Sequence, residues 1–358
     1  MTSSRLVGRC AAWATLLSPF VCAAPAVAHG RRARVETLPV SFRVANTNTS
    51  GVPCTSDGRT YTVRGHLTGP RATLERPRAV TFYLYGYDGG EWNWRLDVPG
   101  YDHAAEMARL GHVSLTIDEL GYGRSDHPDG MATCIGAQAD IAHQIVGMLR
   151  SGRYRARGRR APRFSRVVLA GHDIGGDVAE IEAYSYTDID ALVQMTWADQ
   201  GQTPWIIERA ALAASDWCTT DPQPADGRAG SPSGYHYFTE SRREFRGKLF
   251  FQPDPRVVDA ATRLRSRNPC GIIRSTPTSV WFNMARASEI SVPVLVMFGA
   301  DDTLVWSRDG ERRQQDDYPR SRDRTTVFVP RAGHFPMFAR TAPRFRRVLA
   351  RWLKRHGA

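Results

Sequence analysis

Short apolar runs alternate with amphipathic stretches along most of this chain, which predicts strands alternating with helices. Residues 36–45 and 59–67 alternate apolar and polar side chains, as antiparallel strands at a sheet edge do. Six compact apolar runs predict further strands at residues 80–85, 113–117, 167–170, 191–197, 292–298 and 325–329. Helical spacing lies between several of them and again at residues 345–353. The pattern predicts an α/β fold with an eight-stranded, mostly parallel sheet and helices on both faces.

Residues 200–290 break this rhythm, because they show no clean strand pattern and are rich in Trp, Tyr, Phe, Pro and Gly. Intervals this long in a compact domain are usually lids or binding elements. We therefore expect a cap inserted after the sixth strand. The core would then consist of residues 29–199 and 291–358.

The N-terminal segment has the pattern of a secretory signal peptide. Arg5 and Arg9 form a basic region, residues 11–21 are mostly apolar, and residues 26–28 read Ala-Val-Ala, a typical cleavage site. We expect residues 1–28 to be removed after Ala28 and the protein to be secreted. No later run reaches the ~18 apolar residues of a membrane-spanning helix, so no membrane span is expected.

Composition and charge fit a globular protein with a basic surface. The chain has 42% hydrophobic residues and a net charge of +12 at pH 7, and 46 of its 48 basic residues are arginine. The densest arginine run covers residues 153–166. It is either a solvated loop or a patch that binds an anionic surface or polymer. No aromatic interleaving or nucleic-acid motif accompanies it, so we expect no nucleic-acid partner.

Four cysteines remain once the predicted signal peptide is removed: Cys54, Cys134, Cys218 and Cys270. An even number in an exported protein favours disulfides, and three pairings are possible. Cys218–Cys270 is favoured because both lie in the predicted cap, which leaves Cys54–Cys134 by elimination. The chain has no CxxC pair, metal-ligand cluster, phosphate loop or dinucleotide motif, so we expect neither a metal nor a cofactor.

The strongest chemical signal lies at residues 171–176, which read Gly-His-Asp-Ile-Gly-Gly. They follow one predicted strand and precede a helix. A strand, Gly-x-nucleophile-x-Gly and a helix form a nucleophile elbow, a tight turn that lifts its central side chain above the sheet. Here the central residue is Asp173, where serine is common.

Three further signals follow other predicted strands. His334 lies after the last strand, where it can act as a general base. Asp302 lies after the seventh strand and can orient that histidine, with Asp301 and Asp199 as less favoured alternatives. The loop after the third strand contains Tyr87, whose backbone N–H can form half of an oxyanion hole.

The order nucleophile, acid, histidine is that of the α/β hydrolases, and residues 121–125 (Gly-Tyr-Gly-Arg-Ser) resemble a turn of that superfamily. Over residues 60–357 the chain resembles an α/β-hydrolase-fold protein. The resemblance implies that Asp173 is the nucleophile, His334 the base and Asp302 the acid. It also implies that the backbone N–H groups of Tyr87 and Ile174 form the oxyanion hole.

An aspartate at the elbow resembles the epoxide hydrolase and haloalkane dehalogenase branch. A carboxylate attacks an sp³ carbon there and forms an alkyl-enzyme ester, which a histidine-activated water then hydrolyses. Ile174 stands where that branch often has a halide-binding Trp, so an epoxide is preferred to an alkyl halide. Tyr235 and Tyr237 are candidates to protonate the leaving oxygen, and Asp88 is a possible substrate contact.

Other parts of the chain resemble secreted bacterial α/β hydrolases that usually carry serine at the elbow, and two alternatives therefore stay open. Asp173 could act as a non-covalent acid or base in an ester hydrolase or lyase. The protein could also be an inactive homologue that binds a ligand under its aromatic cap. In each case the expected partner is a small apolar molecule, and the sequence leaves the oligomeric state open.

Overall fold

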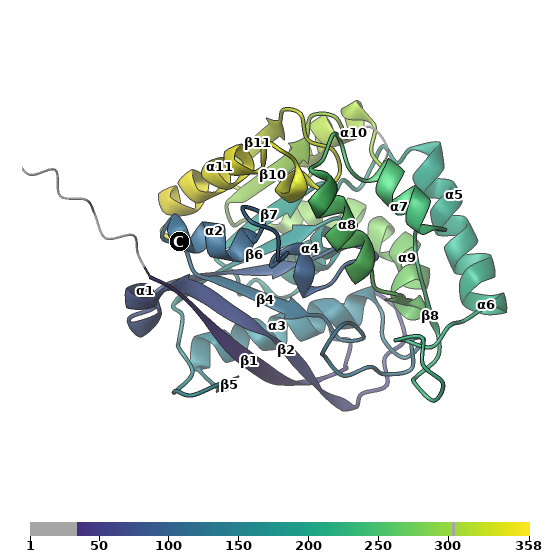
Figure 1. Ribbon diagram of the computed structural model, residues 1–358, viewed down its shortest axis with the longest axis horizontal. Helices are drawn as coiled ribbons and strands as arrows, with labels where there is room; N and C mark the ends of the chain where they lie inside the picture. The colour runs from purple at the N-terminus through teal and green to yellow at the C-terminus, as the bar shows by residue number, and fades with distance from the viewer. Residues whose placement is uncertain (1–33, 303–304) are drawn as a thin grey trace, which may run out of the picture. The chain divides into compact units, whose positions relative to one another are not determined.

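Nine strands form the central sheet of the computed structural model, which describes residues 34–302 and 305–358. The predicted signal peptide and its cleavage site lie outside the described residues. The strands are β1 (Val35–Ala45), β2 (Thr60–Pro70), β3 (Ala79–Leu84), β4 (Ser114–Asp118), β5 (Arg155–Ala156), β6 (Arg166–His172), β7 (Ala191–Met195), β10 (Val294–Gly299) and β11 (Arg324–Val329). Their order across the sheet is β11-β10-β7-β6-β3-β4-β2-β1-β5 (Figure 1).

Strands β11, β10, β7, β6, β3 and β4 pair in parallel, and β2 and β1 extend the sheet as antiparallel strands. All eight predicted strands are present, so a mostly parallel sheet is confirmed. The predicted number of eight is wrong by one, because β5 adds a two-residue strand that pairs with Val40 and Ser41 of β1. This strand lies within the arginine-rich run, where no apolar pattern marks it.

Helices cover both faces of the sheet, as predicted (Figure 1). One layer contains α2 (His103–Arg109) and α11 (Ala342–Arg355), which contact each other. The other contains α3 (Ile135–Ser151), α4 (Ile174–Tyr186) and α9 (Cys270–Arg286), which pack against one another. The short helices α1 (Arg71–Glu75) and α10 (Arg308–Arg313) complete the described core.

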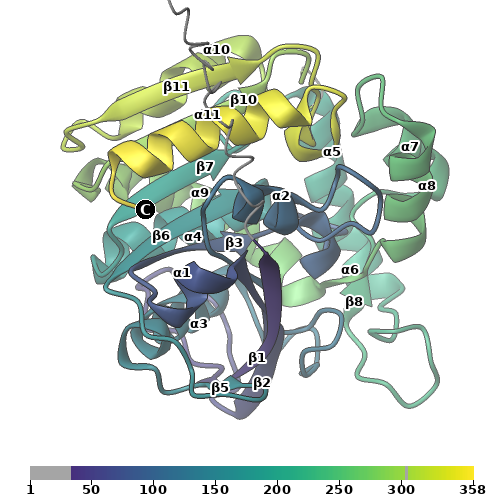
Figure 2. The same cartoon turned by 60° about the vertical axis from the view of Figure 1, so that its left-hand side comes forward.

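The chain between β7 and β10 is mainly helical. Its elements are α5 (Pro204–Leu212), a π-helical turn (Ala213–Trp217), α6 (Cys218–Thr220), β8 (Tyr235–His236), α7 (Arg242–Lys248), α8 (Pro255–Leu264), β9 (Asn268–Pro269) and α9. Helices α5 to α8 gather at one end of the sheet, away from β5 (Figures 1 and 2). Helix α9 packs on α3 and α4, so the last part of the predicted cap contacts core helices directly.

Two disulfides join distant parts of the chain. Cys54 pairs with Cys134, and Cys218 pairs with Cys270, which are the pairs that the sequence favoured. The first links the loop after β1 to the start of α3. The second links α6 to the start of α9 and so closes the 200–290 segment on itself. Among the described residues, no helix has the length and apolar character needed to cross a membrane.

Candidate active site

Asp173 lies in a sharp turn between β6 and α4. Its φ of 53° and ψ of −127° lie in a region that side-chain-bearing residues rarely adopt, so the turn is strained. The Asp173 N–H donates to the carbonyl of Met195 at 2.9 Å, and its carbonyl accepts from the Gly176 N–H at 2.7 Å. A Cβ at Gly175 would lie 2.7 Å from the backbone of Tyr85, so the turn requires glycine there. This is the geometry of a nucleophile elbow.

Loops after β10 and β11 bring Asp302 and His334 to the elbow, as the sequence predicted. His334 Nδ1 lies 2.9 Å from Asp302 Oδ2, and His334 Nε2 lies 3.6 Å from Asp173 Oδ1. All three side chains are buried. The imidazole therefore lies between two carboxylates.

The two less favoured acids lie elsewhere. Asp301 is exposed, and no contact joins it to His334 among the described residues. Asp199 is buried, but its oxygens accept from Trp197, Asn283 and Gln314.

The charges on either side of His334 favour its protonated form. Burial opposes a charge on His334, but the carboxylates of Asp302 and Asp173 outweigh it and raise its pKa to about 10. Burial also opposes a charge on Asp173, but the hydrogen bond and charge of His334 hold the pKa of this carboxyl below its usual value. At neutral pH the site therefore holds an imidazolium between two carboxylates.

One of the two predicted oxyanion donors, the Tyr87 N–H, faces Asp173 itself. The Tyr87 N–H donates to Asp173 Oδ2 at 3.0 Å. Ile174 is the first residue of α4, so its N–H has no carbonyl one turn earlier in the helix to bond to. A Cβ at Gly86 would lie 2.2 Å from Asp173 Oδ2, so only glycine lets the loop approach the carboxylate this closely. One oxygen of Asp173 thus accepts from the Tyr87 N–H, and the other faces His334.

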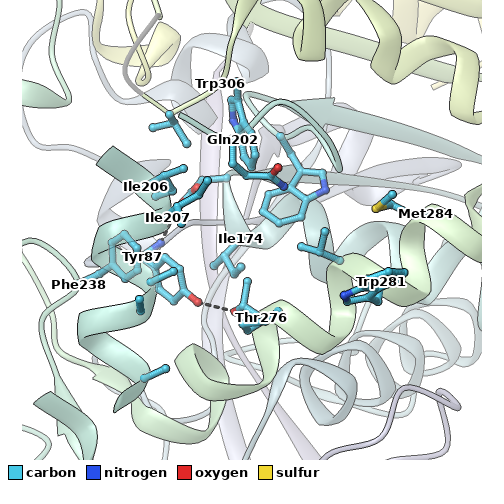
Figure 3. Close-up of a pocket in the computed structure, with 18 residues that line it drawn as sticks. Tyr87, Ile174, Gln202, Ile206, Ile207, Phe238, Thr276, Trp281, Met284 and Trp306 are labelled. Atoms are coloured by element: carbon cyan, nitrogen blue, oxygen red, sulfur yellow. Dashed lines mark hydrogen bonds between the residues drawn. The ribbon is translucent and has the colours of Figure 1, made fainter. Parts of the chain in front are cut away.

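A cavity of about 440 Å³ opens beside Asp173. Its walls are largely apolar and come from α5, α9 and the loops after β7 and β10 (Figure 3). They include Ile174, Ile206, Ala210, Phe238, Val280, Trp281, Met284 and Trp306. The cavity also contains hydroxyl groups: the Tyr87 hydroxyl lies 2.5 Å from Thr276 Oγ1. Such a cavity suits a largely apolar molecule.

A second cavity of about 20 Å³ is lined by both Asp173 and His334, with Trp205, Leu249 and Phe335 among its other walls. A cavity of this size can hold one water molecule, provided that polar groups line it. Asp173 and His334 supply such groups. A water molecule there would contact both the candidate base and the candidate nucleophile.

Two of the predicted substrate contacts lie away from both cavities, so that prediction is wrong for Tyr235 and Tyr237. Tyr235 is buried, and its hydroxyl donates to the carbonyl of Pro128. The ring of Tyr237 lies under Arg265, with 3.8 Å between the guanidinium carbon and the ring centroid. Neither tyrosine is among the residues that line the two cavities.

Asp88 lines the small cavity, but its carboxylate is directed at the 200–290 segment. It accepts hydrogen bonds from the N–H groups of Phe238 and Thr239 and from the Asn268 side chain, and it lies 3.5 Å from Arg265. Instead of the predicted substrate contact, Asp88 anchors the loop that carries Tyr87.

Thr276 is a site residue that sequence reasoning missed. It lies inside α9, one position before Pro277, and nothing in the local pattern separates it from a packing residue. Its place in the cavity comes from the packing of α9 against α4, which no local motif encodes.

Comparisons with known proteins agree with this geometry. The model of the alpha/beta hydrolase family matches residues 85–346. Among solved structures, an esterase from Thermogutta terrifontis in its malate-bound form is 18% identical, with a TM-score of 0.61 over 88% of this chain and 100% of that one. An aryl esterase assigned by similarity, from Burkholderia cenocepacia, is 20% identical, with a TM-score of 0.55 over 88% and 99%.

A monoacylglycerol lipase from Paleococcus ferrophilus is 18% identical, with a TM-score of 0.54 over 77% of this chain and 94% of that one. No curated protein matches the chain. At these identities the likenesses carry the fold alone, and they confirm the fold that the motifs implied. None of these three proteins is an epoxide hydrolase or a dehalogenase by name.

Proposed function

Because the chain belongs to the alpha/beta hydrolase family, we propose that it is a hydrolase in which Asp173 forms an alkyl-enzyme ester with an apolar substrate, an epoxide being the favoured class. The hydrogen bond from the Tyr87 N–H to Asp173 Oδ2 carries this proposal. In a serine hydrolase the oxyanion hole receives the carbonyl oxygen of the substrate. Here the nucleophile's own oxygen fills it, which suits a mechanism whose oxyanion later develops on Asp173.

The first half of the reaction uses Asp173 Oδ1. It attacks the less hindered sp³ carbon of the epoxide, the carbon–oxygen bond breaks, and the bonding electrons stay on the leaving oxygen. That oxygen needs a proton, and Tyr235 and Tyr237 line neither of the cavities beside Asp173. The Tyr87 hydroxyl lines the cavity (Figure 3). Thr276 Oγ1 donates to the carbonyl of Ile272, so in the resting enzyme it accepts the proton of the Tyr87 hydroxyl. To act as the acid, the Tyr87 hydroxyl exchanges this hydrogen bond for one to the leaving oxygen.

The second half of the reaction depends on a change of charge. Esterification makes Asp173 neutral, so His334 loses one of its two carboxylate neighbours and its pKa falls. His334 can then return a proton, through water in the cavity, to the Tyr87 phenolate. Neutral His334 next takes a proton from a water in the 20 Å³ cavity, and the hydroxide attacks the carbonyl carbon of Asp173.

The oxygen that becomes the oxyanion is Oδ2, which the Tyr87 N–H already holds. When this intermediate collapses, the bond to the product oxygen breaks and that oxygen takes the proton of the newly added hydroxyl. A diol leaves, and the Asp173 carboxylate is restored beside a protonated His334. Epoxide and water are consumed, a diol is formed, and every proton is accounted for. Asp302 keeps His334 oriented throughout.

The test is intact mass spectrometry of the His334→Gln variant after exposure to epoxides, alkyl halides and carboxylic esters. Without its base the enzyme should stall after alkylation, so an adduct with the full mass of the epoxide should accumulate and map to Asp173. An adduct from an alkyl halide alone would move the substrate class to halides. If the wild type turns over a substrate and the variant forms no adduct with it, covalent catalysis by Asp173 is excluded.

One observation favours ester hydrolysis without a covalent intermediate as a second candidate: the similar structures named above belong to an esterase, an aryl esterase assigned by similarity and a monoacylglycerol lipase. In that reaction His334 or Asp173 would activate water directly. A single turnover in ¹⁸O-labelled water separates the two mechanisms. Label that enters the enzyme carboxylate supports the alkyl-enzyme, and product label with an unlabelled enzyme supports direct attack by water.

We also propose that the protein is exported after cleavage following Ala28. The two disulfides support this, because such bonds persist mainly in oxidising compartments. Intact mass measurement of the protein from culture medium tests the proposal: a mature chain should begin at His29.

A further inference from the structure

Three potential metal ligands meet at the end of α4 that lies away from the elbow. They are His143 on α3, Glu182 on α4 and Asp188 in the turn after α4. One ligand atom from each residue lies within 4.8 Å of the other two, and His143 Nδ1 is 2.9 Å from Asp188 Oδ2. Glu182 follows Asp173 by nine positions, or ~13 Å along the helix, so the cluster is separate from the candidate active site.

Glu182 is the reason to expect a cation there. Its side chain is 0% exposed, and neither carboxylate oxygen has a hydrogen-bond donor among the described residues. The carboxylate of Asp188 faces it with the same charge. A buried carboxylate without a partner is costly, so Glu182 must either hold a proton or face a cation. Burial does raise its pKa well above the ordinary value, which makes the proton the competing explanation.

We propose that His143, Glu182 and Asp188 bind a divalent transition-metal ion of the zinc class. One imidazole nitrogen and two carboxylates form a ligand set that suits Zn²⁺, whereas Ca²⁺ takes six to eight oxygen ligands. His143 and Asp188 are partly exposed, so an ion can enter and water can complete its coordination.

The imidazole is held in place for this role. The His143 ring stacks on Tyr186, with 4.0 Å between ring centroids and 11° between their planes. The Tyr186 hydroxyl is in turn 3.0 Å from Thr49 Oγ1. This stacking restrains the orientation of the imidazole, whose Nδ1 faces Asp188. The bound ion would join α3 to the far end of the helix that begins at Asp173.

The test uses tag-free, chelator-treated full-length protein, isothermal titration with Zn²⁺ and thermal unfolding. His356→Gln is a matched control, because His356 also lies 2.9 Å from a carboxylate, that of Asp323. Wild type and this control should bind one Zn²⁺ at the cluster and gain ~5 °C in Tm when Zn²⁺ exceeds its Kd about 100-fold. Glu182→Gln and His143→Gln should lose at least ~10-fold in affinity and most of the Tm gain.

His143→Gln changes a half-exposed side chain, so it keeps the test decisive if Glu182→Gln fails to fold. An absence of Zn²⁺ binding in the wild type, or equal binding in all variants, would show that Glu182 holds a proton and would overturn the proposal. An equal Tm gain with Ca²⁺ would contradict the ligand class. Activity plays no part in these readouts, so they stand whether or not Asp173 is a nucleophile.

Discussion

Substituting asparagine for Asp173 should convert His334 from an acid to a base without any substrate. Asparagine keeps the shape of the side chain and removes its charge, as alkylation would. In the wild type the carboxylates of Asp302 and Asp173 raise the pKa of His334 to about 10 against the effect of burial. The proposed mechanism requires that the loss of the Asp173 charge alone make His334 neutral near physiological pH.

The size of the effect follows from one distance. His334 Nε2 lies 3.6 Å from Asp173 Oδ1. At an effective dielectric constant of about 20, two unit charges at this separation attract by about 4–5 kcal/mol, which corresponds to a fall of about 3 in the pKa. The pKa of His334 in Asp173→Asn should therefore be about 7. Asp302 remains and keeps it from falling further.

Histidine NMR measures this directly, since the ring carbon–hydrogen signals titrate with pH and the His334→Gln spectrum identifies the signal of His334. Asp301→Asn is the matched control, because this exposed neighbour carries the same charge and makes no contact with the imidazole. It should leave the His334 titration unchanged. A pKa that stays above about 9 in Asp173→Asn, or that is already ordinary in the wild type, would refute the proposed coupling between alkylation and base formation.

Three further predictions concern stability and the cavity. His334 has a folded-state pKa of about 10 against 6.5 for the free side chain. Its protonation should therefore add up to about 5 kcal/mol to the free energy of unfolding. This stabilisation should be complete below pH 6.5 and be lost as the pH rises through 10. Denaturant unfolding from pH 6 to 11 should show this loss in the wild type and not in His334→Gln. Asp88→Ala should lower the free energy of unfolding, measured with urea, by about 3–5 kcal/mol, because it leaves buried N–H donors and the Arg265 charge without their acceptor. A decrease below ~1 kcal/mol would contradict the anchoring role. In steady-state kinetics, Ala210→Trp should raise KM at least ~10-fold for a bulky apolar substrate and leave KM for a small substrate unchanged. Equal changes in KM for both substrates would show that Ala210 does not set the size of substrate that the cavity accepts.

The sequence predicts the sheet and the row of charged residues for a common reason. Parallel strands buried on both faces appear as short continuous apolar runs, and their carboxyl ends lie at one edge of the sheet. Asp173, Asp302 and His334 each follow such a run, so topology alone brings them together. The glycines around Asp173 add a local signal, because only they permit the turn.

The contacts from the 200–290 segment could not be predicted in this way. Tyr235 and Tyr237 were expected at the site because they are tyrosines in a cap, but side-chain direction there depends on packing between distant elements. Tyr235 instead fills space beside Pro128, and the ring of Tyr237 stacks with Arg265. Thr276 reaches the cavity only because α9 packs on α4, and β5 exists only because β1 offers an edge. Neither has a signal within its own few residues.

The surroundings of Asp173 argue against an elbow that has merely lost a serine. A carboxylate placed by chance in a buried turn would be short of donors and would be costly to keep charged. Asp173 instead has the Tyr87 N–H at one oxygen and the imidazole of His334 near the other, and Gly86 leaves the space that its Oδ2 needs. The small cavity that Asp173 and His334 both line is large enough for the one water that hydrolysis of an ester on Asp173 needs. Asp173, the Tyr87 N–H, His334 and the small cavity therefore form one arrangement, which is the arrangement that the proposed esterification of Asp173 requires.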